Sequence, residues 1–250
     1  MARDMLFYPR RADMATFPET DNTFNGLLET DALNIGYRLF LCENARAFVL
    51  LFHGNGEIAA DFDVFAPFYR KAGLSVLVVD YRGYGWSEGE VRGTALLSDA
   101  EAILYRLSGL LHDHDLSMLP RFVMGRSLGS APAIHLAYRF PEQFRGLIVE
   151  CGFGHLPTML TAYGLPDSIV RLLYDPIGNL RKIKQIRLPL LLVHGEDDDV
   201  VPVEHGDALH ECCPSLQKVL LRVPDAKHNV MAVQPEQYIA AIEEYLNLVV

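Results

Sequence analysis

The chain has 250 residues, enough to bury one large core; half of them are hydrophobic and 22% are charged. This composition is typical of a globular protein and excludes a disordered one. The 22 basic and 32 acidic side chains give a formal net charge of −10, which argues against binding to nucleic acid or to anionic lipid surfaces.

The cysteines and the N-terminal sequence indicate the cellular compartment in which the protein is expected. Cys42, Cys151, Cys212 and Cys213 form no C-x-x-C pair, so free thiols in a reducing cytoplasm are the expectation. The first residues contain no apolar stretch long enough for a signal peptide. No segment approaches the roughly 20 apolar residues of a membrane span. We therefore expect a cytoplasmic protein without integral membrane association.

Short apolar runs alternate along the chain with longer amphipathic stretches. Two early stretches, around Phe24–Leu28 and Ile35–Cys42, alternate as an exposed antiparallel edge does. The later runs are almost wholly apolar, as expected for strands covered on both faces: Phe48–Phe52, Leu74–Val79, Phe122–Met124, Leu147–Val149, Leu190–Val193 and Val219–Val223. Segments with helical spacing lie between them: Ile58–Ala72, Thr94–Leu107, Ser127–Phe140, Glu204–Cys213 and Pro235–Leu248. This order predicts an α/β fold, a mostly parallel twisted sheet of about eight strands wrapped by helices.

One interval departs from this rhythm. Residues 152–188 contain no predicted strand and read as two or three short helices between prolines, so we predict a lid inserted into a single domain spanning residues 1–250. Its apolar residues either line a pocket or pack the underside of the lid: Leu156, Met159, Leu160, Tyr163, Leu165, Ile169, Leu172, Leu173 and Tyr174.

The segment Gly125–Gly129 fits the pattern G-x-S-x-G with Ser127 at its centre. In this pattern the serine occupies a tight strand-to-helix turn, and its neighbours must lack bulky side chains. The hydroxyl then stands at a helix N-terminus, which favours developing negative charge. Ser127 directly follows the strand that ends at Met124 and opens a helix rich in small residues, so we predict that it is a nucleophile.

The same pattern occurs a second time, at Gly85–Gly89, with Ser87 at its centre. Ser87 stands seven residues beyond Asp80, where the preceding strand ends, and no helix follows it. We therefore interpret Ser87 as a residue of a glycine-rich loop.

A serine nucleophile needs a base, and the base needs an acid to fix its tautomer. Among nine histidines, only His228 lies beyond the last predicted strand, in a polar turn before the final helix, where loops carry functional side chains on a rigid frame. Three consecutive aspartates, Asp197, Asp198 and Asp199, follow the strand Leu190–Val193, and composition does not choose among them. Glu150, at the end of another strand, is a fourth candidate.

From about Phe24 to its C-terminus the chain resembles the α/β-hydrolase superfamily, and within it small bacterial hydrolases of unassigned substrate. The resemblance rests on the G-x-S-x-G segment, on His194-Gly-Glu-Asp-Asp-Asp-Val-Val-Pro202 and on His53-Gly-Asn-Gly56. It implies that Asp198 is the acid, that the backbone N–H groups of Asn55 and Leu128 form the oxyanion hole, and that His53 supports the loop. The segment Asp80–Gly89 is similar to a superfamily signature that shapes the wall beside this loop.

We therefore expect a serine hydrolase that cleaves a carboxylic ester or thioester of a small, apolar acyl substrate. The alternatives are a serine aminopeptidase or amidase and a non-catalytic binding protein on the same fold. No cofactor is expected, since Gly83-Tyr-Gly85 lacks the third glycine of a dinucleotide site and no phosphate-cradling motif occurs. His112-Asp-His-Asp115 reads as a polar loop and not as a metal site.

Overall fold

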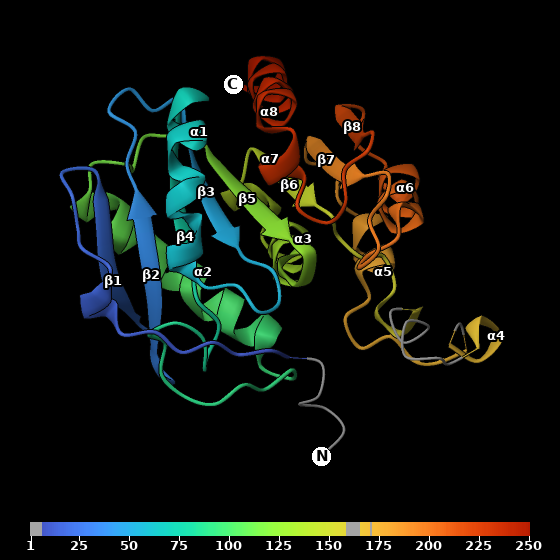
Figure 1. Ribbon diagram of the computed structural model, residues 1–250, viewed down its shortest axis with the longest axis horizontal. Helices are drawn as coiled ribbons and strands as arrows, with labels where there is room; N and C mark the ends of the chain where they lie inside the picture. Colours follow the sequence, from blue (N-terminus) through green and yellow to red (C-terminus); the bar gives the residue numbers. More distant parts are fainter. Residues whose placement is uncertain (1–6, 159–165, 171) are drawn as a thin grey trace.

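The computed structural model describes residues 7–158, 166–170 and 172–250. In this part of the chain one eight-stranded sheet has the order β1-β2-β4-β3-β5-β6-β7-β8 (Figure 1). Its strands are β1 Thr23–Glu29, β2 Asn34–Phe40, β3 Ala47–Phe52, β4 Leu74–Val79, β5 Arg121–Arg126, β6 Gly146–Glu150, β7 Leu190–Gly195 and β8 Lys218–Val223. Strand β2 runs opposite to the other seven strands of this sheet, which confirms the predicted mostly parallel sheet with an antiparallel edge.

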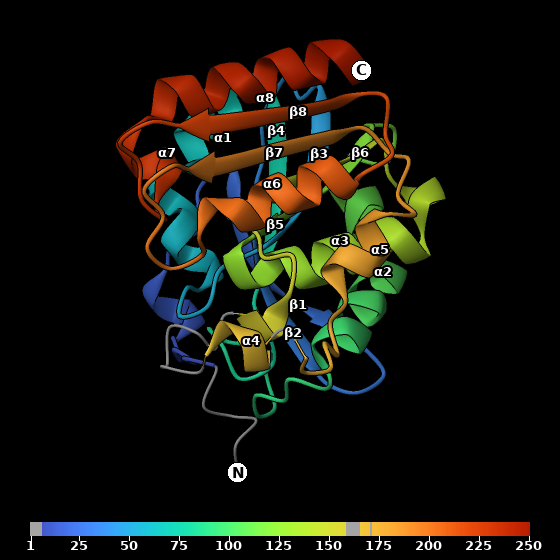
Figure 2. The same cartoon turned by 90° about the vertical axis from the view of Figure 1, so that its right-hand side faces the viewer.

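Helices cover both faces of the sheet. The α-helices are α1 Ala66–Lys71, α2 Leu96–Asp113, α3 Ser130–Arg139, α4 Asp167–Val170, α5 Asn179–Ile183, α6 Val203–Cys212, α7 Val230–Val233 and α8 Pro235–Val249. Short 3-10 helices are η1 Met14–Thr16, η2 Ala59–Val64, η3 Ser127–Gly129 and η4 Pro141–Gln143. Buried residues of α1, α7 and α8 pack on one face, and those of α2, α3, α5 and α6 on the other. Figure 2 shows β7 and β8 between α8 on one side and α6 on the other.

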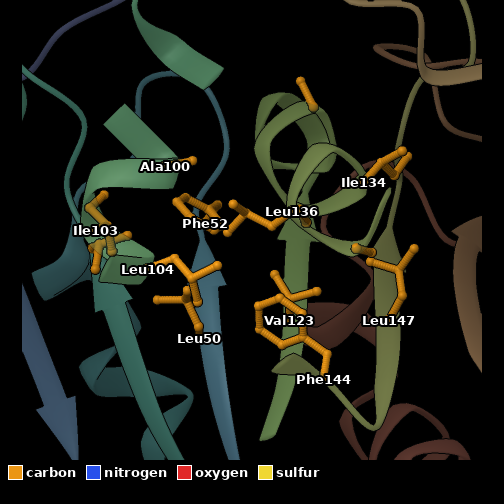
Figure 3. Packing of buried hydrophobic residues seen from close by; sticks show 14 of the residues in the cluster. Leu50, Phe52, Ala100, Ile103, Leu104, Val123, Ile134, Leu136, Phe144 and Leu147 are labelled. Carbon is orange, nitrogen blue, oxygen red and sulfur yellow. The ribbon is translucent and has the colours of Figure 1, made fainter. Parts of the chain in front are cut away.

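The apolar strands form the core because they are buried on both sides. Along β3, Leu50 and Phe52 face the cluster that includes α2 and α3, whereas Val49 and Leu51 face the cluster that includes α8. Figure 3 shows the first of these clusters, in which Val123 of β5 lies beside Leu50 under the two helices. Strands of this kind must be apolar throughout, which is why their sequence shows no alternation.

Two predicted helices differ from those observed. The segment Ile58–Ala72 is not one helix but η2 followed by α1, which begins at Ala66. Pro67 explains the break, because proline lacks an N–H and is tolerated only in the first turn of a helix. Helix α2 continues to Asp113, six residues past the predicted end at Leu107, because Leu110 and Leu111 extend its buried face.

The segment between β6 and β7 contains α4 and α5 and no strand among its described residues. Met159, Leu160, Tyr163 and Leu165, predicted to belong to the lid, are outside the described residues. Leu156 is partly buried against the core, while Ile169, Leu172, Leu173 and Tyr174 are exposed. For these four side chains the structure therefore shows neither of the two roles predicted from the sequence, packing under the lid or lining a pocket.

None of the helices in the described ranges combines the length and the apolar composition needed to cross a bilayer. The four cysteines are all free thiols.

Candidate active site

Ser127 lies at the turn between β5 and α3. Strand β5 ends at Arg126, η3 begins at Ser127, and α3 follows from Ser130. Ser127 has a φ of 52°, a left-handed backbone conformation that residues other than glycine rarely adopt. The residue is buried, with 8% of its surface exposed. Strain of this kind persists only where the surrounding structure enforces it, and it is common at functional sites.

The two glycines that flank this serine leave no room for a side chain. A Cβ atom on Gly129 would lie 1.9 Å from the carbonyl oxygen of Phe52, the last residue of β3. A Cβ atom on Gly125 would lie 2.1 Å from the carbonyl oxygen of Gly129. The serine turn therefore packs with its backbone directly against the end of β3, from which the predicted oxyanion loop begins.

The loop after β3 is held from several sides. Asn55 accepts hydrogen bonds on its side-chain oxygen from the Tyr84 hydroxyl and from the Tyr8 N–H, each at 2.9 Å. The Tyr81 hydroxyl donates to the His53 carbonyl oxygen at 2.5 Å, and the fully buried His53 donates from Nδ1 to the Gly54 carbonyl oxygen at 2.8 Å. His53 thus supports the loop, as expected. Leu128, the other predicted oxyanion residue, follows Ser127 in η3.

Ser87, the centre of the second G-x-S-x-G match, has a structural role. It is fully buried, its hydroxyl donates to the Asp80 carbonyl oxygen at 3.1 Å, and it accepts the Gly36 N–H at 2.8 Å. Both partners are backbone groups, so this hydroxyl joins the loop to strand β2.

The structure brings His228 and Asp198 together at the same edge of the sheet. His228 donates from Nδ1 to Asp198 Oδ2 at 2.8 Å, and its side chain is 15% exposed. Asp198 lies in the loop after β7, and His228 lies between β8 and α7. The His228 carbonyl oxygen also accepts a hydrogen bond from Arg126 at 3.1 Å, which places the histidine loop against the residue before Ser127. A bond through Nδ1 leaves Nε2 as the ring nitrogen able to serve a hydroxyl.

Asp198 is surrounded by donors. Its Oδ1 accepts the N–H groups of Val200 and Val201 at 2.9 and 2.8 Å. The buried His194 lies on the other side, with Nε2 3.4 Å from Asp198 Oδ2 and 2.8 Å from the Val201 carbonyl oxygen, so Nε2 carries the proton. Burial by itself would raise the pKa of the Asp198 carboxyl, but hydrogen bonds from His194 and His228 hold that pKa well below its ordinary value.

The other candidate acids have different partners. Asp197 and Asp199 are exposed, and Asp199 pairs with Lys227 at 2.8 Å. Glu150 is buried and bonded to Arg126 Nε at 3.2 Å and to the Tyr238 hydroxyl at 2.9 Å. Burial raises the pKa of Glu150, and the positive charge of Arg126 opposes this. Of the four carboxylates, Asp198 is the one that receives a hydrogen bond from His228.

Three side chains at this edge were missed by the sequence reasoning: Arg126, Glu57 and His194. Arg126 occupies the variable position before Ser127, and its register partner on β6 is Glu150. Opposite charges at the ends of two otherwise apolar neighbouring strands are a signal that could have indicated this pair. His194 ends the apolar run of β7, where a fully buried polar residue needs a partner.

The donor atoms of Cys151, His194 and Asp198 lie within 4.8 Å of one another, a spacing that could suit a metal ion. The donor chemistry does not fit. Burial raises the pKa of the Cys151 thiol, which opposes formation of the thiolate that a metal ligand needs. Both oxygens of Asp198 are already engaged by backbone groups and by His228.

Comparison with known families matches residues 43–180 to a family described as serine aminopeptidase, S33. An uncharacterized membrane protein of Saccharomyces cerevisiae is 31% identical over 208 residues, which cover 82% of this chain and 72% of the yeast protein. The alpha/beta hydrolase domain-containing protein 17C of Xenopus laevis is 28% identical over 223 residues, or 85% of this chain. These residues span 66% of the frog protein, so the chain is shorter than these relatives.

Among solved structures, the esterase Pf2001 of Pyrococcus furiosus superposes with a TM-score of 0.75 at 20% identity. The superposition covers 96% of this chain and 98% of the esterase. At this identity the likeness shows that the two proteins share a fold.

Proposed function

Because the chain belongs to the serine aminopeptidase S33 family of α/β hydrolases, we propose that it hydrolyses a carboxylic ester or thioester through an acyl-enzyme on Ser127. The observation that carries this proposal is the hydrogen bond from His228 to Asp198 at the sheet edge where Ser127 stands in its strained turn. A serine, a buried carboxylate and a histidine, in this chain order, are the parts of acyl-transfer machinery in this fold.

In the proposed reaction, His228 Nε2 takes the proton of the Ser127 hydroxyl while Oγ attacks the carbonyl carbon of the substrate. The carbonyl π bond opens, and the resulting oxyanion accepts hydrogen bonds from the backbone N–H groups of Asn55 and Leu128. Collapse breaks the bond to the alcohol or thiol, which leaves with the proton from His228. Water then repeats the sequence on the acyl-enzyme and releases the acid. Asp198 holds the tautomer of His228 and stabilises its positive charge.

An ester or thioester is favoured over a peptide because two carboxylates near the nucleophile, Glu57 and Glu150, are already paired with Arg126 and so are not available to bind an ammonium group. An aminopeptidase must recognise a free ammonium group, for which a carboxylate is the usual partner. Glu57 and Glu150, which flank the residue before Ser127, are both bound by Arg126. The chain belongs to a family of serine aminopeptidases, so aminopeptidase activity is the second candidate.

A panel of p-nitrophenyl esters, acyl-thioesters and aminoacyl amides tests this proposal. We expect turnover of esters or thioesters with kcat/KM at least about 10²-fold above that of the amides, and loss of this activity in Ser127→Ala. Amides turned over as fast as esters would favour the aminopeptidase. Esterase activity that survives in Ser127→Ala would show that it arises elsewhere.

A further inference from the structure

Arg126 lies at the junction of the segments that surround Ser127. It is the last residue of β5, is 7% exposed, and donates to acceptors on three other segments. Its Nη1 bonds to Glu57, its Nε bonds to Glu150 Oε1 at 3.2 Å, and its Nη2 bonds both to the His228 carbonyl oxygen at 3.1 Å and to the Asn229 side chain. One planar guanidinium thus spans the ends of β5 and β6 and the loops after β3 and β8.

Two of these bonds lead directly to the proposed catalytic groups. Glu57 accepts the Gly54 N–H on its second oxygen at 2.7 Å, so the carboxylate connects Arg126 to the loop that carries Asn55. A Cβ atom on Gly54 would lie 2.9 Å from Arg126 Nη1, which shows how closely the loop approaches the guanidinium. On the opposite side, Arg126 holds the main chain of His228 itself.

The two carboxylates beside Arg126 keep its guanidinium charged and hold it in one orientation. Burial opposes the positive charge of Arg126, but the two carboxylates outweigh it and raise the pKa of the guanidinium above its ordinary value. Glu150 is in turn fixed by the Tyr238 hydroxyl at 2.9 Å. Lysine could supply the charge but not the geometry, because its ammonium is a point donor whereas the arginine fork reaches several acceptors in fixed directions.

We propose that Arg126 is a positioning residue, which sets the base His228 and the oxyanion loop at their working distances from Ser127. The inference rests on the proposed function, since it concerns the same reaction. Its physical basis is that displacing a reacting group by about 1 Å can cost roughly 10²-fold in rate. Arg126 has no contact with substrate in this role and acts through the main chain of His228 and through Glu57.

The test is Arg126→Lys, assayed with the best ester of the panel well below the melting temperature. We expect kcat to fall about 10²-fold while KM changes less than about threefold, because binding of the ground state does not depend on the alignment of the base. A merely structural role predicts a lower melting temperature with kcat of the folded enzyme retained.

Arg38→Lys is the matched control. Arg38 is 3% exposed and bonds to both oxygens of Asp63, at 2.5 and 3.0 Å, and to Asn25. It lies on β2, which β4 and β3 separate from β5. We expect Arg38→Lys to lower the melting temperature as much as Arg126→Lys does and to change kcat by less than about twofold.

Asn229→Ala supplies a second test should Arg126→Lys not fold, because Asn229 is exposed and its loss leaves the charge of Arg126 paired. We expect Asn229→Ala by itself to lower kcat about fivefold. Where Arg126→Lys does fold, adding Asn229→Ala to it is expected to cause little further loss. Unchanged kcat in Arg126→Lys, or in Asn229→Ala where Arg126→Lys does not fold, overturns the positioning role while leaving the proposed function intact. An equal loss of kcat in Arg38→Lys does the same. A wild-type protein inactive on the whole panel overturns the proposed function and this inference with it.

Discussion

Replacing Asp198 by asparagine is expected to lower kcat about 10⁴-fold, the loss seen when the buried acid of a serine–histidine–aspartate set is replaced in this way. Asp198 accepts the Nδ1 proton of His228 at 2.8 Å, which leaves Nε2 free to take a proton from Ser127. An asparagine amide can donate to Nδ1 instead, which would stabilise the wrong tautomer of the histidine. Steady-state kinetics with an ester substrate measures the effect, and a melting curve shows that the variant is folded.

The neighbouring carboxylates provide the controls. Asp199→Asn removes an exposed pair with Lys227, and Asp197→Asn changes another exposed side chain, so each is expected to alter kcat by less than about twofold. Glu150→Gln is expected to cost less than about tenfold, because Glu150 contacts Arg126 and Tyr238 rather than the ring of His228. A 10⁴-fold loss in any of these three variants, with Asp198→Asn active, would assign the acid to another residue.

Replacing Gly129 by alanine is expected to destabilise the protein by about 3 kcal/mol and to abolish turnover. The new Cβ atom would lie 1.9 Å from the Phe52 carbonyl oxygen and 2.9 Å from that of His53. Both are backbone atoms at the end of a buried strand, so the clash is relieved only when the turn that carries Ser127 moves away from the oxyanion loop. Urea unfolding measures the first effect and ester hydrolysis the second.

Gly109→Ala is the control for this change. Gly109 lies in the exposed surface of α2, where a Cβ atom would meet nothing within 4 Å. We expect this variant to be more stable by about 0.5–1 kcal/mol, since glycine is unfavourable inside a helix, and fully active. If Gly129→Ala proved as stable and as active as the wild type, the close packing of the serine turn on β3 would be contradicted.

The sheet was predictable from the sequence because the strands from β3 to β7 are buried on both faces and stand out as short apolar runs. Ser127 could be separated from Ser87 for a related reason, since only Ser127 directly follows such a run and opens a helix. The break between η2 and α1 was missed because apolar spacing continues through Pro67, and the backbone constraint of proline outweighed that pattern.

The partners of the buried charges could not be predicted in the same way. The three adjacent aspartates are the same residue type, so the sequence alone does not say which one is buried. The turn after β7 decides this, because Oδ1 of Asp198 accepts the N–H groups of Val200 and Val201. Likewise, Arg126 and Glu57 are far apart in the sequence, and only the packing of the loop after β3 against β5 brings them together. Contacts of this kind depend on the tertiary fold rather than on local pattern.

Labelling with a fluorophosphonate probe tests the central claim, that Ser127 is an activated nucleophile, without knowledge of the substrate. The serine oxygen attacks phosphorus and fluoride leaves, so the label stays on the protein. We predict that the wild type is labelled, that Ser127→Ala is not, and that Ser87→Ala is labelled as the wild type is, because the hydroxyl of Ser87 is buried against Gly36 and Asp80. Labelling that persists in Ser127→Ala, or a wild-type protein that is never labelled, would contradict the account.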